Sequence, residues 1–144
     1  MPLTITSANS VVLFSIPGLF PVPVQIQGFQ ADAAFATDSV EPAEVVMGVD
    51  GKMSAGYTPY MTKQTYSIQA DSSSAVLFDA WQAAQKSSGD IYFANATIVI
   101  PGVGRSYTMT KGALTGYKAI PDAKKVLQGR EFTVTWEGVD PTSI

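Results

Sequence analysis

The 144-residue sequence contains no cysteine and no histidine. Without cysteine the chain can form neither a disulfide nor a thiolate metal site. Without histidine it lacks the commonest general base and the commonest transition-metal ligand, so neither a Ser-His-Asp nor a Cys-His nucleophile can be built. A zinc site would need an all-oxygen shell, which zinc rarely accepts. We therefore expect no catalytic residues, no cofactor and no metal, and we interpret the protein as a non-enzyme.

Charge is also scarce in this chain. Charged residues make up 15% of it, against about 25% in a typical soluble domain. Only nine residues are Lys or Arg and the net charge is −3, so a general electrostatic attraction to nucleic-acid phosphates is not expected. Hydrophobic residues reach 46%. This composition indicates that something other than water covers part of the surface.

The few charges are unevenly distributed along the sequence. Residues 1–100 hold eight acids and three bases, a net charge of −5, whereas residues 101–144 hold six bases and four acids, a net charge of +2. Such asymmetry suits head-to-tail contacts between unlike surfaces of identical subunits. An acidic lining would also let DNA pass through a channel without adhering to it.

The first 31 residues contain no charged side chain at all. A secretory signal would need a basic region before its apolar core, and prolines at positions 17, 21 and 23 interrupt the apolar stretch, so neither a signal nor a membrane-spanning helix is favoured. Two interpretations remain: a buried pair of N-terminal strands, or a surface that contacts other subunits. We favour subunit contacts, because a free monomer exposing Phe14, Phe20 and Phe29 would tend to aggregate.

Alternating apolar and polar residues predict strands over most of the chain. Residues 11–16 form a β-branched and aromatic run that ends at Pro17-Gly18, and residues 22–29 alternate next to Pro21 and Pro23. Because proline cannot donate a ladder hydrogen bond, this second run is predicted to be an edge strand, where another subunit would add. Further strands are predicted at residues 61–70, 91–100, 105–119 and 130–137.

A hairpin is predicted around Asp50-Gly51, which lies between two strand-like segments at residues 43–49 and 52–58. This dipeptide is the strongest short-range hairpin signal, because a type I′ turn needs positive φ at both central positions. We expect the hairpin to act in assembly more than in folding. The predicted contacts between subunits or rings are Phe14, Phe20, Phe29, Val46, Asp50, Gly51 and Met53.

A single helix is predicted at about residues 74–86. Asp71 and the three serines after it are N-cap candidates, and Gly89 can adopt the left-handed conformation that ends a helix. One face, spaced i, i+3, i+4, i+7, should pack on a sheet, and Asp79, Gln82 and Lys86 fall on the other face. The predicted packing face is Leu77, Ala80, Trp81 and Ala84. One helix between runs of strands with short connections predicts a mainly β fold with one α-helix, β-barrel-like or sandwich-like, in a single domain over residues 1–144.

Several segments, taken in order, resemble the tail tube proteins of long-tailed (Caudoviricetes-type) bacteriophages. They are the Asp50-Gly51 hairpin with its following lysine, the strand at residues 62–70, the helix containing VLFDAWQAAQ, the strand at residues 91–100, and the closing REFTVTWEGV, which ends in Glu137-Gly138. The resemblance covers about residues 40–140 and lies in the order of elements, not in a catalytic signature. The uncharged N-terminal segment lies outside it.

The resemblance implies a β-barrel-like subunit with one flanking helix, related in architecture to the type VI secretion tube protein. Six copies would form a homohexameric ring, and rings would stack into a hollow tube that conducts the viral genome into the host. The hairpin at residues 43–58 would reach the neighbouring ring. The implied partners are other copies of the chain, sheath, baseplate and tape-measure proteins, and DNA that passes without sequence-specific binding, with no membrane insertion. The implied location is the virion tail, with the host cytoplasm during assembly.

Two other functions stay open. The first is a type VI-like tube or another tail ring component such as a terminator, which a ring that stops at one hexamer would identify. The second is a carbohydrate-binding β-sandwich, which glycan affinity in a soluble monomer would identify. Only Tyr57, Tyr60 and Tyr66 favour this function. A stacking platform for nucleic acid would need a basic groove, and only Lys52 and Lys63 lie nearby, so the three tyrosines are better interpreted as core or interface residues.

Overall fold

The computed structural model describes residues 10–27, 35–70 and 72–143. Within these residues the chain forms nine strands and one helix. The strands are β1 (Val11–Ile16), β2 (Phe20–Ile26), β3 (Phe35–Thr37), β4 (Ala43–Met47), β5 (Met53–Tyr57), β6 (Thr62–Ile68), β7 (Ala94–Ile100), β8 (Arg105–Tyr117) and β9 (Arg130–Ser143), and the helix is α1 (Ala75–Ser88). In the described part of the chain, no helix has the length and apolar character needed to cross a membrane.

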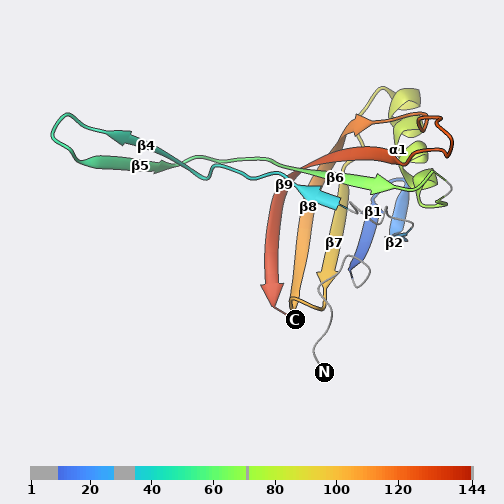
Figure 1. Ribbon diagram of the computed structural model, residues 1–144, viewed down its shortest axis with the longest axis horizontal. Coiled ribbons are helices and arrows are strands. Elements are labelled where there is room, and N and C mark those ends of the chain that lie inside the picture. Colours follow the sequence, from blue (N-terminus) through green and yellow to red (C-terminus); the bar gives the residue numbers. More distant parts are fainter. Residues whose placement is uncertain (1–9, 28–34, 71, 144) are drawn as a thin grey trace.

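Seven strands form one antiparallel sheet in the order β2-β1-β7-β8-β9-β6-β3, and β4 and β5 form a separate hairpin. The sheet curls along the long strands β8 and β9, with α1 at one end of the curl (Figure 1). The curl brings distant strands together: Phe14 of β1 packs edge-on against Tyr66 of β6, with 5.2 Å between ring centroids, although β7, β8 and β9 lie between these strands in the sheet. The expected mainly β fold with one packed helix is confirmed.

An aromatic cluster fills the curl of the sheet. Phe132 and Trp136 alternate with less buried residues along β9, and both are fully buried. Phe78 of the helix stacks on Phe132, with 4.4 Å between ring centroids, and packs against Phe14 at 5.7 Å. Each large aromatic side chain buries roughly 150–250 Å². This cluster therefore supplies much of the apolar burial that holds α1 on the sheet.

The helix packs through a face that is rotated from the predicted one. Leu77 and Trp81 are buried, as predicted, but Ala80 and Ala84 are only half-buried. Phe78 lies at the centre of the face because its ring removes far more apolar surface from water than an alanine methyl group does. The buried helix residues are Ala75, Leu77, Phe78, Trp81 and Gln85.

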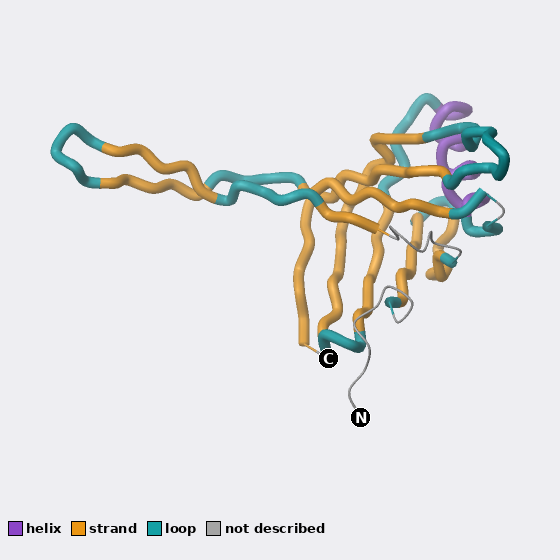
Figure 2. The backbone as a smooth tube through the Cα atoms, in the orientation of Figure 1, coloured by secondary structure: helices purple, strands orange, loops and turns teal. Residues whose placement is uncertain are grey.

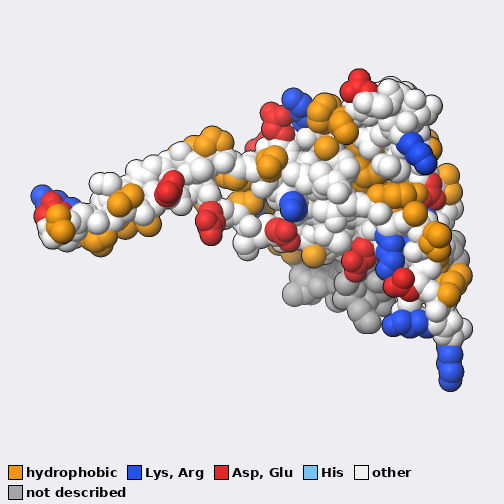
Figure 3. Space-filling model, turned by 90° about the horizontal axis from the view of Figure 1, so that it is seen from above, with side chains coloured by type: hydrophobic (Ala, Val, Ile, Leu, Met, Phe, Trp, Pro, Cys, Tyr) orange, Lys and Arg blue, Asp and Glu red, His pale blue; other side chains and the backbone are white. Residues whose placement is uncertain are grey.

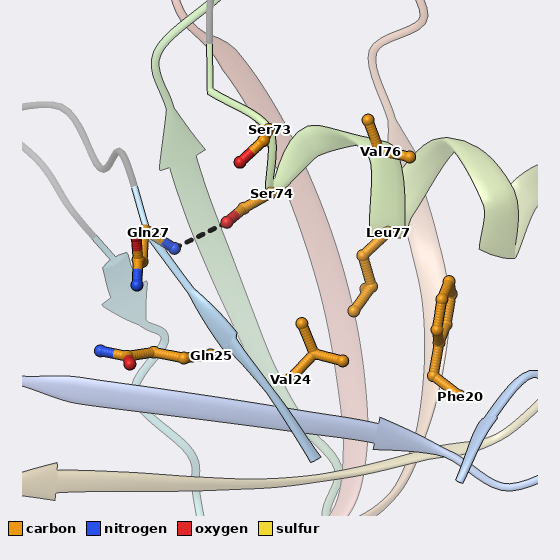
Figure 4. Close-up of a pocket in the computed structure, with 8 residues that line it drawn as sticks. All are labelled: Phe20, Val24, Gln25, Gln27, Ser73, Ser74, Val76 and Leu77. Atoms are coloured by element: carbon orange, nitrogen blue, oxygen red, sulfur yellow. Dashed lines mark hydrogen bonds between the residues drawn. The ribbon is translucent and has the colours of Figure 1, made fainter. Parts of the chain in front are cut away.

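The helix begins and ends at residues predicted to cap it, but the residue at its N-terminal end makes a different hydrogen bond from the expected one. Ser74 is the N-cap residue and makes no capping hydrogen bond with its side chain. Its Oγ instead accepts a hydrogen bond of 2.8 Å from the backbone N–H of Gln27, which follows β2 (Figure 4). Leu77 points toward Val24 of β2 in the same view, so this end of α1 is attached to β2. Gly89 ends the helix with a left-handed φ of 70°, as predicted.

The first N-terminal strand, β1, belongs to the core of its own subunit. The alternate side chains of β1 are fully buried: Val12, Phe14 and Ile16. The interpretation as buried strands fits β1 but not β2, which is mostly exposed. Phe14 is not available to another subunit, so its prediction as a contact residue is wrong. Phe20 is half-buried, and Phe29 lies outside the described residues. The strand β2 is an edge strand, as predicted, and Val22 on it is 72% exposed, so a subunit contact along this edge stays a prediction.

The last strand is longer than the sequence pattern indicated. It continues to Ser143 instead of ending at residue 137, because β8 pairs with it from Arg105 opposite Ser143 to Tyr117 opposite Phe132. Main-chain hydrogen bonding sustains this extension where the apolar alternation has already ended. The segment between the two strands, residues 118–129, is called the basic loop below.

Candidate functional site

The hairpin projects from the curled sheet as a long two-stranded ribbon (Figures 1 and 2). We call residues 41–58 the arm, and every residue in it is exposed. Since a strand rises about 3.3 Å per residue, the stretch from Glu41 to Asp50 reaches about 30 Å. The predicted hairpin is confirmed, and none of its side chains belongs to the buried core.

The turn at the tip of the arm differs from the predicted type. The N–H of Gly48 donates to the carbonyl of Lys52 at 2.8 Å, and the N–H of Gly51 donates to the carbonyl of Gly48 at 3.0 Å. Only Gly51 has a positive φ here, at 82°. This pattern is a three-residue loop with a left-handed glycine in third place, not a two-residue type I′ turn. Asp50 stabilises it, because its Oδ1 accepts a hydrogen bond of 3.1 Å from the N–H of Lys52.

The loop length gives the arm one apolar face. Directly opposite residues of a hairpin point to the same side, and successive residues point to opposite sides. The face that we call the apolar face consists of the pairs Ala43 with Tyr57, Val45 with Ala55, and Met47 with Met53. The other face consists of Glu44 with Gly56 and Val46 with Ser54. All six side chains of the apolar face are aliphatic, aromatic or thioether groups, so the arm is amphipathic.

The apolar face is largely exposed, although the ring of Tyr57 makes an edge contact with Tyr60 at 6.5 Å between centroids. Met47, Met53 and Tyr57 are 65%, 64% and 75% exposed. A two-stranded hairpin is marginally stable in water by itself, and burying a Val or Met side chain contributes about 1.5–3 kcal/mol. Contact with another protein surface would therefore stabilise the arm, and the apolar face is the strongest candidate for that contact.

A groove lies at the root of the arm, with a volume of about 600 Å³. Its apolar lining comes from the residues that follow the arm and from the outer surface of the sheet, and it includes Pro59, Met61, Phe93 and Ala113. Lys111 lies at this groove with its ammonium group 5.1 Å from the centroid of the Phe93 ring. The same ammonium group pairs with Glu137 at 3.4 Å. The groove is thus largely apolar, and the charge of Lys111 beside it is already paired with that of Glu137.

An ion pair joins the helix to the sheet. The side chain of Arg130, at the start of β9, is 8% exposed and donates hydrogen bonds of 2.6 and 3.2 Å to the two carboxylate oxygens of Asp79. Tyr117 donates a third hydrogen bond to Asp79 at 2.5 Å. Hydrogen bonding from Arg130 holds the pKa of Asp79 below its ordinary value. Asp79, which was predicted to lie on the face opposite the packing face, therefore also attaches the helix to the sheet.

The predicted contact residues separate into several groups in the structure. Asp50 and Gly51 lie at the tip of the arm, Met53 lies on its apolar face, and Val46 lies on the opposite face. Val45 and Met47, which belong to the apolar face, were not predicted as contact residues, whereas Tyr57 of the same face was interpreted as a core or interface residue. Among the residues that the structure describes, no three acidic side chains gather into a group that could hold a metal ion.

The comparisons with known proteins agree with this architecture. The family described as "Tail fiber protein gp32" matches residues 3–140, whereas no curated protein matches the sequence. The chain is also similar to a chain of the PVC sheath-tube complex, an extracellular contractile injection system in its extended state. That match has a TM-score of 0.65 at 11% identity and covers 100% of this chain and 93% of that chain.

Two solved structures of the anti-feeding prophage are similar as well. The match to its tube-terminating cap has a TM-score of 0.63 at 11% identity and covers 100% of this chain and 94% of that chain. The match to its baseplate has a TM-score of 0.60 at 12% identity and covers 99% of this chain and 97% of that chain. At such identities the likeness shows a shared fold, and it confirms the resemblance to tail tube proteins at that level. Because the family match covers nearly the whole sequence, the chain belongs to the tail fiber protein gp32 family, a family of tail structural proteins.

Proposed function

We propose that the protein is the structural subunit of a phage tail tube, in which hexameric rings stack into a hollow tube that conducts the viral genome into the host. The arm carries this proposal, because an exposed ribbon with an uncovered apolar face adds nothing to its own core and is suited to packing against another copy. The fold shared with chains of a sheath-tube complex and a tube-terminating cap supports it.

The proposed role needs contacts and an inert passage, not a catalytic site. A net charge of −3 suits a channel that lets DNA pass, because an acidic wall repels phosphates. The partners would be other copies of the chain and the sheath, baseplate and tape-measure proteins. The subunit would assemble in the host cytoplasm and reside in the virion tail.

The family description favours a second candidate, a subunit of a tail fibre. The geometry supports the tube more strongly. The long arm leaves the curled sheet as a projection (Figure 1), which suits contact with a neighbour in a ring or in the next ring. It would obstruct the close parallel bundling of chains along a thin shaft.

The test compares two neighbouring valines that are alike except for the face they occupy. Val45 is 57% exposed on the apolar face and Val46 is 64% exposed on the opposite face. We expect Val45→Asp to prevent assembly, because it would bury a charge in the contact, and Val46→Asp to assemble as the unmodified chain does. Both variants should keep the unmodified melting temperature, since neither side chain belongs to the core.

Negative-stain electron microscopy and analytical ultracentrifugation of the purified chains provide the readout. Rings and tubes from the unmodified chain and from Val46→Asp, with none from Val45→Asp, would support the proposal. Tubes of normal length from both variants would show that the apolar face is not part of the interface. Thin shafts without a ring would favour the fibre.

A further inference from the structure

The basic loop, residues 118–129, is an ordered surface with a positive charge. It contains three lysines and one aspartate, a net charge of +2. Lys118 pairs with Asp122 at 2.8 Å, whereas none of the ion pairs found among the described residues includes Lys124 or Lys125. The basic loop therefore presents two lysines that form no ion pair with the described residues, although Lys118 and, to a smaller extent, Lys124 lower the pKa of Asp122.

The tip of the basic loop is held in place by its own backbone. The N–H of Gln128 donates to the carbonyl of Asp122 at 2.8 Å, and Ala123 forms a β-bridge with Leu127. At the start of the loop, Nε of Arg130 donates to the carbonyl of Lys118 at 2.9 Å. A surface that is already ordered loses little conformational freedom when a partner binds.

The basic loop also exposes apolar side chains beside its lysines. Ile120, Val126 and Leu127 are 76%, 73% and 57% exposed. Three large apolar side chains exposed on one short loop are a candidate contact site between proteins. The partner should therefore offer apolar groups together with negative charge.

The arm offers both. It contains three acids and one lysine, a net charge of −2, and none of the ion pairs of the described residues involves it. Its apolar face supplies the hydrophobic groups. Since its two strands lie about 4.8 Å apart, the ribbon is narrow enough for lysine side chains to reach acids on either of its faces. The arm and the basic loop thus carry opposite net charges, and both expose apolar side chains.

The arm and the basic loop lie at opposite ends of the molecule. The arm leads into β6 at Thr62, and β6 runs away from it to Ile68. Ile68 lies opposite Arg130, the residue that follows the basic loop. The space-filling view shows hydrophobic and acidic side chains along the arm, with a basic group at its tip, and several Lys and Arg side chains with acidic ones among them at the far end of the body (Figure 3). One subunit cannot bring these two surfaces together, whereas two copies placed head to tail can.

We propose that the arm of one copy docks on the basic loop of the next copy, with the apolar face lying against Ile120, Val126 and Leu127, and with Lys124 and Lys125 reaching past the edges of the narrow ribbon to Glu41 and to Glu44, which lies on the opposite face. This inference rests on the proposed role of the arm in assembly and names its receptor. The groove at the root of the arm is the weaker receptor, because its Lys111 already pairs with Glu137 and offers no free cation to the acids of the arm.

Charge reversal tests the pairing. The loop variant carries Lys124→Glu and Lys125→Glu, the arm variant carries Glu41→Lys and Glu44→Lys, and the combined variant carries all four changes. Lys63→Glu with Lys86→Glu is the control, because it alters the net charge as the loop variant does, at exposed positions outside both surfaces. Circular dichroism should show all four chains folded with closely similar melting temperatures.

We expect the loop variant and the arm variant each to raise the critical concentration for assembly at least about tenfold, since like charges across an interface repel. The combined variant should return to within about threefold of the unmodified chain, because its charges are again complementary. The control should assemble normally.

Two results overturn the inference. One is normal assembly of the loop variant, and the other is failure of a folded combined variant to recover. Val45→Asp separates these results from a failure of the proposed function. If Val45→Asp blocks assembly while the loop variant assembles normally, the arm acts in assembly but docks elsewhere. If both variants assemble normally, the proposed role of the arm fails as well.

Discussion

Replacing Asp79 by Asn should destabilise the subunit through the ion pair that fastens α1 to β9. The guanidinium group of Arg130 is almost completely buried and donates two hydrogen bonds to Asp79. Hydrogen bonds to charged groups contribute about 1.5–3 kcal/mol, and removing one partner of a fully buried pair costs about 3–5 kcal/mol. Because the side chain of Asp79 is 43% exposed, solvent screens part of this interaction, and we expect a loss of about 2 kcal/mol.

The loss can be measured by urea unfolding and by thermal unfolding followed by circular dichroism. For a chain of this length a loss of about 2 kcal/mol corresponds to a fall of roughly 4–8 °C in Tm. Asp140→Asn is the matched control, because Asp140 is exposed near the end of β9 and should change Tm by less than about 1 °C. Equal effects of the two substitutions would show that the ion pair contributes nothing to stability.

The loss of stability caused by Asp79→Asn should depend on pH. The pKa of Asp79 is lowered in the folded chain by the hydrogen bonds from Arg130, whereas an unfolded Asp titrates near about 3.9. Below that value the unfolded chain binds a proton that the folded chain does not, so the contribution is complete above about pH 4 and is lost as the pH falls through the folded pKa. The stability difference between the unmodified chain and Asp79→Asn should therefore be full at pH 6 and shrink below about pH 4. A difference that grows in acid would refute the reasoning.

Two glycines give further predictions. A Cβ at Gly112 would lie 2.4 Å from the buried ring of Trp136, so Gly112→Ala should lower the free energy of unfolding by about 1–3 kcal/mol. Gly56→Ala is the control and should leave the free energy of unfolding unchanged, because its Cβ would meet nothing within 4 Å. Equal urea midpoints for the two variants would contradict this prediction. Gly51→Val would force a β-branched residue into the left-handed φ of 82° at the tip of the arm, a local cost of about 1–2 kcal/mol. This variant should fold normally by circular dichroism and form few tubes by electron microscopy, while Gly51→Asn, which tolerates that conformation, should form more; normal tubes from Gly51→Val would show that the tip is dispensable.

Local patterns predicted the elements of this fold well. The alternation of Phe132 and Trp136 with polar residues identified β9, the prolines identified β2 as an edge strand, and Gly89 marked the end of the helix. Each of these signals depends on a few neighbouring residues. The packing of Phe14 against Tyr66 depends on the curl of the whole sheet, which no local pattern contains. For that reason Phe14 was assigned to a subunit contact when it lies in the core.

The apolar face of the arm was not predicted because the observed turn has one residue more than the two-residue turn expected from the sequence. A type I′ turn centred on Asp50-Gly51 would set Met47 opposite Ser54 and mix the two faces. The observed loop sets Met47 opposite Met53, a shift of one position that moves every side chain of one strand relative to the other. The ion pair between Asp79 and Arg130 escaped for a different reason, since 51 positions separate its members and only the docking of α1 brings them together.

The separation of the arm from the buried core has a consequence for how this sequence can change over time. A substitution on the arm removes no contact that the body needs in order to fold, so quality control that recognises unfolded chains would not detect it. In the proposed assembly, selection on the arm would act only through the surface that receives it. The arm would then be free to diverge quickly provided that its receptor diverges with it. Each lineage of such a protein could acquire subunits that fold alike but do not assemble with those of another lineage.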